Sequence, residues 1–302
     1  MLSSIIRKRN TPTPLTPIIY SGLIGVLWLT NIRSLKLSLI LVVLLGAVVF
    51  FRHSRPFVRD ILPIVMMMFA YEAMRGLVVD LGWSVHITEL FNTERRLFGT
   101  IPSADLQRLW HATGIYHWYD YTLALFYGSF YFIPFVVGIT LWVKRRDYYY
   151  FYINGLVLLT LAGYVTYIVY PAMPPWMASE QGYFSGVTKM IIDLSQSGLG
   201  IHLPSLYSAL GANQVAAMPS IHSAWPWYSF LCLIYLYRWR AAWSLVVPVG
   251  IWLAVVYLGE HYIIDVIAGI VYATAAFLIM FAFRNKILKP APLTHAATTV
   301  TP

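Results

Sequence analysis

Residues 241–283 read AAWSLVVPVGIWLAVVYLGEHYIIDVIAGIVYATAAFLIMFAF. The stretch consists of two apolar runs, separated by the turn-forming Gly259 and the polar residues Glu260 and His261. Each run approaches the roughly 20 apolar residues that a helix needs to cross the hydrocarbon core of a bilayer, which is about 30 Å thick. The stretch therefore predicts two membrane-spanning helices joined by a short polar turn.

The whole chain has the composition of a membrane protein. Of its 302 residues, 59% are hydrophobic and only 11% are charged, which is too apolar for a water-soluble domain of this size. The predicted spans, about eight by length and hydropathy, are 16–32, 35–51, 60–81, 118–143, 148–170, 219–236, 241–258 and 263–283. We expect an all-α, polytopic transmembrane helical bundle. The first two runs are so close in sequence that a re-entrant hairpin is an alternative to two spans.

One membrane domain accounts for most of the chain. We expect a cytoplasmic N-terminal segment at 1–15, a membrane domain at 16–285 with its catalytic core at about 60–285, and a disordered cytoplasmic tail at 286–302, rich in Thr, Ala and Pro. The N-terminus resembles an uncleaved signal anchor. The sole cysteine, Cys232, lies in a predicted span, so we expect no disulfide framework.

Basic residues indicate the orientation of the spans. The net charge of +9 comes from short clusters at span ends, which is a topology signal and not a sign of nucleic-acid binding. With the N-terminus in the cytoplasm, six basic residues lie outside, Arg75 lies within a span, and fourteen lie inside: Arg7, Lys8, Arg9, Arg52, Arg55, Arg59, Lys144, Arg145, Arg146, Arg238, Arg240, Arg284, Lys286 and Lys289. We therefore expect an integral protein of the plasma membrane with both termini cytoplasmic. Its long loops, near 82–117 and 171–218, then face outward.

The segment MPSIHS at 218–223 opens one predicted span. Proline suits the first position of a helix, which places His222 in the first turn. The free amides and positive dipole of such a turn favour an anion. Because Pro226 cannot donate to the carbonyl of His222, we expect the turn to be kinked and partly open. This local geometry suits a phosphate.

The segment YLGEHYIID at 257–265 joins the last two predicted spans. Helical spacing places His261 and Asp265 on one face, with the carboxylate inside the bilayer, where an unpaired charge is costly. A carboxylate that binds one ring nitrogen of a histidine fixes its tautomer and directs the other nitrogen at a substrate. The charge-derived topology places His222 and His261 at the same outer face. The alternative is that each histidine is an interfacial residue satisfied by backbone or lipid.

These segments resemble the second and third signature motifs, PSxH and HxxxD, of the type 2 phosphatidic acid phosphatase superfamily. The 39 positions between His222 and His261 are also typical of that superfamily. The segment YPAMPPW at 170–176 resembles its inositol phosphorylceramide synthase branch. The resemblance covers about residues 60–285 and implies a six-helix core domain.

The resemblance also implies roles for the motif residues. His261 would attack phosphorus to form a phosphohistidine, Asp265 would orient it, and His222 would protonate the leaving oxygen, with no metal or other cofactor. From the residues alone, either histidine could be the nucleophile, and only the proximity of Asp265 favours His261. The substrate-binding candidates within the motifs are Ser220, Tyr170, Trp176, Glu260 and Tyr262.

The chain departs from the superfamily pattern in its cations. The first motif, KxxxxxxRP, is absent before the PPW segment, and Ala254 and Val255 stand where a serine and an arginine are expected. A phosphoryl group in transfer needs positive partners. Arg75 is the first candidate, although it could instead pair with Glu72, one turn away. Further candidates in the first outer loop are Arg95, Arg96 and Arg108.

Glu260 has three interpretations: a second acid or base, a ligand of an acceptor hydroxyl, or a solvated carboxylate at a helix start. We favour the last, because a helix dipole stabilises it. Together with His222, His261 and Asp265 it would supply plausible metal ligands, but the spacing matches no metal pattern, and we expect none.

The sequence predicts an enzyme that transfers or cleaves a phosphate group of a phospholipid or lipid phosphate at the outer leaflet. A hydroxyl acceptor, as in transfer of an inositol phosphate-like head group, gives a transferase. Water gives a phosphatase of lipid phosphates or polyprenyl pyrophosphates. An alternative of another class is a non-catalytic membrane transporter or lipid-binding scaffold.

Overall fold

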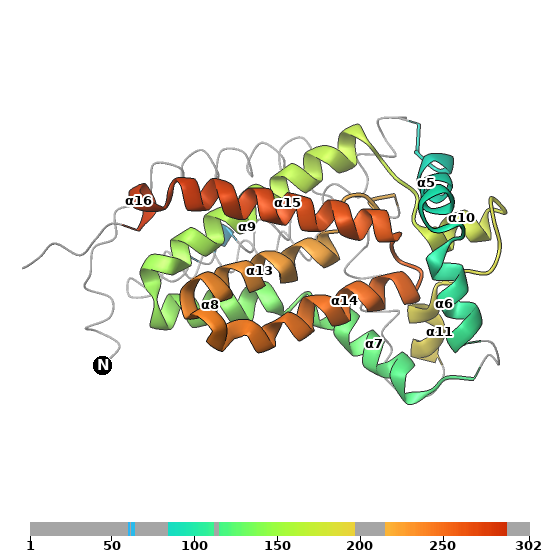
Figure 1. Ribbon diagram of the computed structural model, residues 1–302, viewed down its shortest axis with the longest axis horizontal. Helices are drawn as coiled ribbons and strands as arrows, with labels where there is room; N and C mark the ends of the chain where they lie inside the picture. The colour runs from blue at the N-terminus through green and yellow to red at the C-terminus, as the bar shows by residue number, and fades with distance from the viewer. Residues whose placement is uncertain (1–59, 61, 64–83, 112–114, 197–214, 289–302) are drawn as a thin grey trace, which may run out of the picture.

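The computed structural model describes residues 60, 62–63, 84–111, 115–196 and 215–288, and there the chain is helical apart from isolated bridges (Figure 1). The long helices form a bundle: α7 (Trp118–Ser129), α8 (Ile133–Lys144), α9 (Arg146–Val169), α13 (Ile221–Tyr237), α14 (Val246–Tyr257) and α15 (Ile263–Ala282). Four short helices gather at one end of it: α5 (Thr88–Phe98), α6 (Pro102–Trp110), α10 (Pro175–Glu180) and α11 (Met190–Gln196). We call these four the helical cap. The last element, α16 (Arg284–Ile287), lies at the opposite end.

Within the described residues, three helical stretches are long and apolar enough to cross a membrane: Arg146–Val169, Ile221–Tyr257 and Ile263–Ala282. The second, 37 residues long, reverses at the 3-10 helix η1 (Arg238–Leu245). Trp252, in the middle of α14, donates a hydrogen bond of 3.4 Å to the carbonyl of Ser223, near the start of α13. The two halves therefore run antiparallel, and they correspond to the predicted spans 219–236 and 241–258.

The predicted span 118–143 is bent. Helices α7 and α8 qualify as a span only together, and their axes differ by 51°. Pro134 lies in the first turn of α8, where it cannot donate to the carbonyl of Phe130 and its ring crowds that carbonyl. The predicted span is therefore formed by two helices with a bend between them, and Pro134 lies at that bend.

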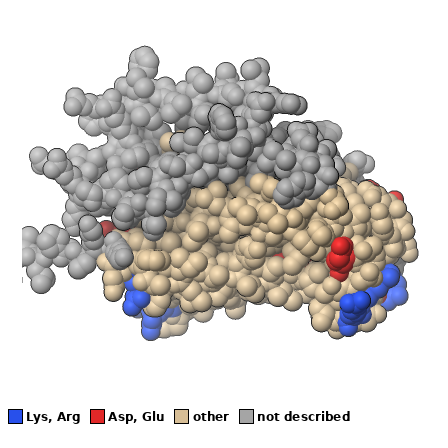
Figure 2. Space-filling model, turned by 90° about the horizontal axis from the view of Figure 1, so that it is seen from above, with Lys and Arg blue, Asp and Glu red and all other residues tan. Residues whose placement is uncertain are grey.

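Charge is distributed along the molecule as expected for a protein that crosses a bilayer. Figure 2 shows basic side chains at the two ends of the visible face and a middle section with almost none. At the end opposite the cap, Arg146 forms a buried ion pair with Asp60, which also accepts a hydrogen bond of 3.0 Å from Trp142 Nε1. Together with the apolar helices, these features indicate an integral membrane protein. The predicted spans 16–32 and 35–51, the segment 1–15 and most of 60–81 lie outside the described residues.

Helices α13 and α15 approach each other closely where both begin. The backbone nitrogen of Ser220 donates to the carbonyl of Asp265 at 3.0 Å, and the Ser223 hydroxyl donates to Val266 O at 3.2 Å. Gly269 makes this approach possible, because a Cβ there would lie 2.1 Å from Ser223 Oγ. The absence of a side chain at this position therefore brings the starts of the two helices together.

The helical cap fixes the turn between α14 and α15. Gln107 of α6 donates to Tyr257 O at 2.9 Å and to Thr188 O at 3.0 Å. Gly259 has a φ of 79°, and a Cβ on it would lie 2.7 Å from Thr188 O. Glycine meets both requirements, a left-handed backbone and a close approach by another chain segment. The turn that carries His261 is thus held from outside the bundle.

Candidate active site

His222 lies in the first turn of α13, as predicted. Ser220 is the N-cap, and its hydroxyl accepts a hydrogen bond of 3.2 Å from the Ser223 backbone nitrogen. Pro219 does not occupy the first helical position, which belongs to Ile221. That expectation was wrong because the serine side chain satisfies a free amide of the first turn, so the helix begins after the serine. The helix also continues through Pro226.

His261 lies in the turn before α15. Its backbone nitrogen and that of Glu260 both donate to Val255 O, at 3.1 and 3.0 Å. Helix α15 has Tyr262 as its N-cap, and Asp265 accepts a hydrogen bond of 2.9 Å from the Tyr262 backbone nitrogen. The prediction that His261 and Asp265 share a helical face was therefore wrong. Their spacing is instead that of a turn residue and a capping carboxylate.

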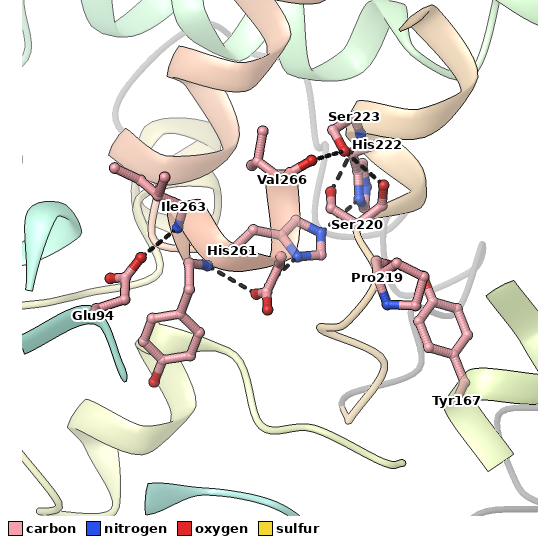
Figure 3. Close-up of polar contacts among 11 residues, drawn as sticks. Glu94, Tyr167, Pro219, Ser220, His222, Ser223, His261, Ile263 and Val266 are labelled. Atoms are coloured by element: carbon pink, nitrogen blue, oxygen red, sulfur yellow. Dashed lines mark hydrogen bonds and ion pairs between the residues drawn. The ribbon is translucent and has the colours of Figure 1, made fainter. Parts of the chain in front are cut away.

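The two histidines nevertheless come together (Figure 3), and Asp265 lies next to His261. His222 Nδ1 lies 2.9 Å from His261 Nε2, which is hydrogen-bond distance. On the other side of the imidazole, His261 Nδ1 lies 3.5 Å from Asp265 Oδ2. His261 and Asp265 are buried, with 3% and 0% of their surfaces exposed. A carboxylate at Nδ1 favours the tautomer with its proton there, leaving the lone pair on Nε2.

Aromatic rings hold His222 in place. The ring of Tyr127 stacks on it with centroids 5.0 Å apart, and the ring of Phe130 lies at 4.0 Å. Phe130 caps the end of α7, where the bend to α8 begins. The rings at the end of α7 thus pack against His222 next to the bend. Sequence reasoning missed both aromatic residues, because nothing short of the packing of α7 on α13 places them there.

The remaining predicted site residues are distributed around the turn. Trp176 of α10 is buried, and its backbone nitrogen donates to Gly259 O at 3.0 Å. Tyr262 is fully buried at the N-cap of α15. Tyr170, at the end of α9, stacks on the ring of His86 at 3.8 Å. Glu260 is only 7% exposed, so the interpretation as a solvated carboxylate was wrong: the cap covers the turn and excludes water from it.

A family model of the PAP2 superfamily matches residues 88–279, more than half of the chain. The chain belongs to the PAP2 superfamily. The match begins at α5 and includes both histidine segments, and it confirms the family predicted from the motifs. The phosphoinositol dihydroceramide synthase of Bacteroides thetaiotaomicron is 28% identical over 207 residues, which cover 64% of this chain and 67% of that protein. No solved structure matches the chain.

The basic residues that could replace the missing motif cations lie in different surroundings. Arg75 lies outside the described residues. Arg108 is exposed and pairs with Asp105 at 2.8 Å, and Arg95 lies over the ring of Phe91 at 5.4 Å. Lys189 is one of the six basic residues predicted to lie outside. Its Nζ lies 3.9 Å from the ring centroid of Trp176. Lys189 therefore lies against a residue that contacts the turn before His261.

A second buried carboxylate, that of Glu94 on α5, also reaches the start of α15. Its Oε1 accepts a hydrogen bond of 2.5 Å from the backbone nitrogen of Ile263 (Figure 3). Sequence reasoning missed this residue. The available signal was its position on the same face of α5 as the apolar Leu90 and Phe91, where a carboxylate is costly unless it is satisfied.

Across the described residues, no group of three or more His, Cys, Asp or Glu side chains is arranged to hold a metal ion. The polar groups at the starts of α13 and α15 interact with one another and with backbone amides. The available chemistry is that of a histidine pair with an orienting carboxylate.

Proposed function

We propose that this PAP2 superfamily protein is a lipid phosphotransferase that acts through a phosphohistidine on His261. The observation that carries the proposal is that His261 lies between the other two residues. Its Nδ1 is 3.5 Å from Asp265 Oδ2, and its Nε2 is 2.9 Å from His222 Nδ1. The aspartate lies at one nitrogen of His261, so the other nitrogen is the available nucleophile. His222 lies beside that nucleophile and is the available acid.

The reaction proceeds in two steps. In the first, the lone pair of His261 Nε2 attacks phosphorus, the bond from phosphorus to the leaving oxygen breaks, and that oxygen takes its electron pair and a proton from His222. In the second, an acceptor hydroxyl gives its proton to His222 and its oxygen attacks phosphorus. The bond between phosphorus and Nε2 breaks, which returns the electron pair to His261 and regenerates the enzyme.

Substrate binding has to separate the two histidines. A nitrogen-to-nitrogen distance of 2.9 Å leaves no space for a phosphorus atom and its oxygens between the rings. The phosphoryl group therefore replaces the hydrogen bond between the histidines with contacts to its own oxygens. Because Asp265 and the backbone of the turn retain His261, we expect His222 to move instead, against the rings of Tyr127 and Phe130.

Transfer to an alcohol is favoured over hydrolysis by two observations. The similar protein from Bacteroides thetaiotaomicron is named a synthase, in which a phosphoinositol group and dihydroceramide are combined. The buried Trp176 contacts the turn that carries His261, and Glu260 in that turn is itself buried, which reduces access of water to a phosphorylated intermediate. We propose an inositol phosphate-like head group as the group transferred and a lipid hydroxyl as its acceptor, with phosphatase activity on lipid phosphates as the second candidate.

Lys189 is proposed to bind the phosphate or head group. Its side chain is half-buried on the face of Trp176, and Glu260 is among the charges that act on it. Burial lowers the pKa of Lys189, and the charges of Glu260 and Glu180 oppose that change. In its protonated form, a lysine beside the turn supplies a positive charge of the kind that the missing motif residues would provide.

The proposed location follows from the charge asymmetry: the site faces outward at the plasma membrane, with both termini cytoplasmic. An assay with purified protein in mixed micelles of phosphatidylinositol tests the reaction, with dihydroceramide or simple alcohols as acceptors. Transfer predicts a phosphorylated acceptor whose yield rises with acceptor concentration. Release of water-soluble phosphate products alone, at every acceptor concentration, would establish the phosphatase instead. Equal activity of wild type, His261→Ala and His222→Ala would exclude catalysis by this site.

A further inference from the structure

The carboxyl group of Glu94 is buried at a position where an apolar side chain would be expected. None of its surface is exposed, and it shares the inward face of α5 with Leu90 and Phe91. Burying a carboxyl group costs free energy unless its polar atoms gain partners. If α5 needed only to pack against its neighbours, a leucine would serve better. The carboxyl group is therefore expected to make a specific polar interaction in addition to packing.

The partner of Glu94 is the first amide of α15. Its Oε1 accepts a hydrogen bond of 2.5 Å from the nitrogen of Ile263, which is 169 positions away in the sequence. The first amides of a helix have no partner within the helix, and the dipole there favours a negative charge. Glu94 thus holds the start of α15 from a separate element of the helical cap (Figure 3).

Two carboxylates share this helix start. Asp265 accepts from the Tyr262 nitrogen at 2.9 Å, and Glu94 accepts from the nitrogen of the next residue, Ile263. The Asp265 oxygen that caps Tyr262 is the same Oδ2 that faces His261 Nδ1. Any shift of the first turn of α15 therefore changes the relation between Asp265 and His261.

From these contacts we infer that Glu94 is a positioning residue: by holding the first amide of α15, it fixes the placement of Asp265 against His261. The inference rests on the function proposed above. Glu94 touches neither histidine and acts through the backbone of α15. Misplacement of reacting groups by about 1 Å is enough to reduce a rate about 100-fold.

The pKa of the carboxyl group reflects its burial and its contact with the start of α15. Burial raises the pKa of Glu94 from 4.5 to about 7, the Ile263 N–H opposes that rise, and the charge of Asp265 adds to it. The second oxygen, Oε2, is buried and has no hydrogen-bond partner among the described residues. The Ile263 N–H, with a smaller contribution from the Ile264 N–H, thus compensates for placing this group in the interior.

The experiment compares Glu94→Ala and Glu94→Gln by steady-state kinetics in the phosphatidylinositol assay. Alanine removes the acceptor, so we expect kcat to fall about 10-fold to 100-fold while KM changes less than about threefold, because the substrate contacts remain. Glutamine keeps an oxygen for the Ile263 amide, so we expect it to restore most of kcat. The matched controls are Glu89→Ala and Glu89→Gln, on the same helix at an exposed position, and they should retain wild-type kcat.

A second variant removes the donor of the hydrogen bond between Ile263 and Glu94 instead of its acceptor. Ile263→Pro removes the donor, and proline is tolerated at the first position of a helix. The N-cap before it, Tyr262, has φ and ψ of −73° and 157°, which suit a residue preceding proline. We expect Ile263→Pro to lower kcat, and the double variant with Glu94→Ala to lose no more than the more impaired single variant.

Wild-type kcat in folded Glu94→Ala or in Ile263→Pro would overturn the inference. A Glu94→Gln variant as impaired as Glu94→Ala, or fully additive losses in the double variant, would also overturn it. Folding is checked for each variant by its elution as a single species in detergent and by its unfolding temperature. If His261→Ala abolishes turnover and Glu94→Ala does not change it, only this inference fails. If His261→Ala remains active, the proposed function itself fails.

Discussion

The hydroxyl of Ser223 on α13 occupies the space that a side chain on Gly269 of α15 would need. A Cβ at Gly269 would lie 2.1 Å from Ser223 Oγ and 2.4 Å from the carbonyl oxygen of Ser220. Neither group can move easily, because Ser223 Oγ donates to Val266 O and Ser220 donates its backbone N–H to Asp265 O. This contact brings the helix start that carries His222 toward the one that carries Asp265.

Gly269→Ala should therefore separate the two helix starts. We expect a loss of about 1–3 kcal/mol of stability from overpacking and a reduced kcat, because the acid His222 is displaced relative to the nucleophile His261. The control is Gly128→Ala on α7, where a Cβ meets no atom within 4 Å, and which should be neutral or slightly stabilising. Unfolding temperatures and kcat measured side by side test the prediction. Equal behaviour of the two variants would show that the crossing tolerates a methyl group.

Asp265→Asn tests the orienting role of the carboxylate. The amide oxygen can still accept from the Tyr262 nitrogen, so the start of α15 is retained. The charge that faces His261 Nδ1 is lost, and we expect kcat to fall about 10³-fold to 10⁴-fold with little change in unfolding temperature. A kcat within threefold of wild type would show that His261 does not depend on this carboxylate.

Lys189→Gln tests the proposed contact with the head group. Glutamine retains much of the side-chain length and removes the charge that lies over Trp176. We expect KM for phosphatidylinositol to rise at least about tenfold, since a charge-assisted contact to phosphate is worth about 1.5–3 kcal/mol. Arg108→Gln is the matched control, because Arg108 is exposed and pairs with Asp105. If both variants raise KM equally, the effect is one of general surface charge.

The pKa of Glu94 predicts a specific pH dependence of stability. Folding raises this pKa from 4.5 to about 7, so the folded state binds the proton more tightly. The resulting stabilisation is complete below pH 4.5 and is lost as the pH rises through about 7; it amounts to about 3 kcal/mol at most. The titratable groups at the start of α15 that act on Glu94 or respond to it, Asp265 and Tyr262, stay in place in Glu94→Gln.

Unfolding temperatures between pH 5 and pH 8 measure that effect. Wild type should lose more stability than Glu94→Gln across this interval, and Glu89→Gln should follow wild type. Parallel curves for wild type and Glu94→Gln would contradict the raised pKa. A larger loss in the glutamine variant would contradict the sign of the effect.

The sequence predicted best those features of the fold that a single physical rule determines. Long apolar runs and asymmetric basic clusters predicted helices that place His222 and His261 at one end of the bundle. Short-range geometry was less predictable: the spacing of His261 and Asp265 fits a helical face, but α15 begins only after its N-cap, Tyr262, which leaves His261 in the preceding turn. The bend between α7 and α8 was not predicted, although Pro134 lies in the first turn of α8.

The contacts that sequence reasoning missed depend on packing between distant segments. Glu94 reaches Ile263 across 169 positions, and no local pattern pairs these two residues. Tyr127 and Phe130 reach His222 only because α7 ends beside α13. Lys189 was recognised as an outer charge, but its place on Trp176 requires the fold of the cap. Local rules thus identified the reacting groups, whereas the residues that hold them needed the three-dimensional structure.

Covalent labelling of the enzyme tests the central claim most directly. Wild type, His261→Ala and His222→Ala are each mixed with phosphatidylinositol that carries radioactive phosphorus in its phosphate group, stopped within one turnover, and digested for peptide mapping. The proposed mechanism predicts an acid-labile label in wild type on the peptide that contains His261, and no label in His261→Ala. Turnover by wild type without any covalent label, or a label that persists in His261→Ala, would contradict it.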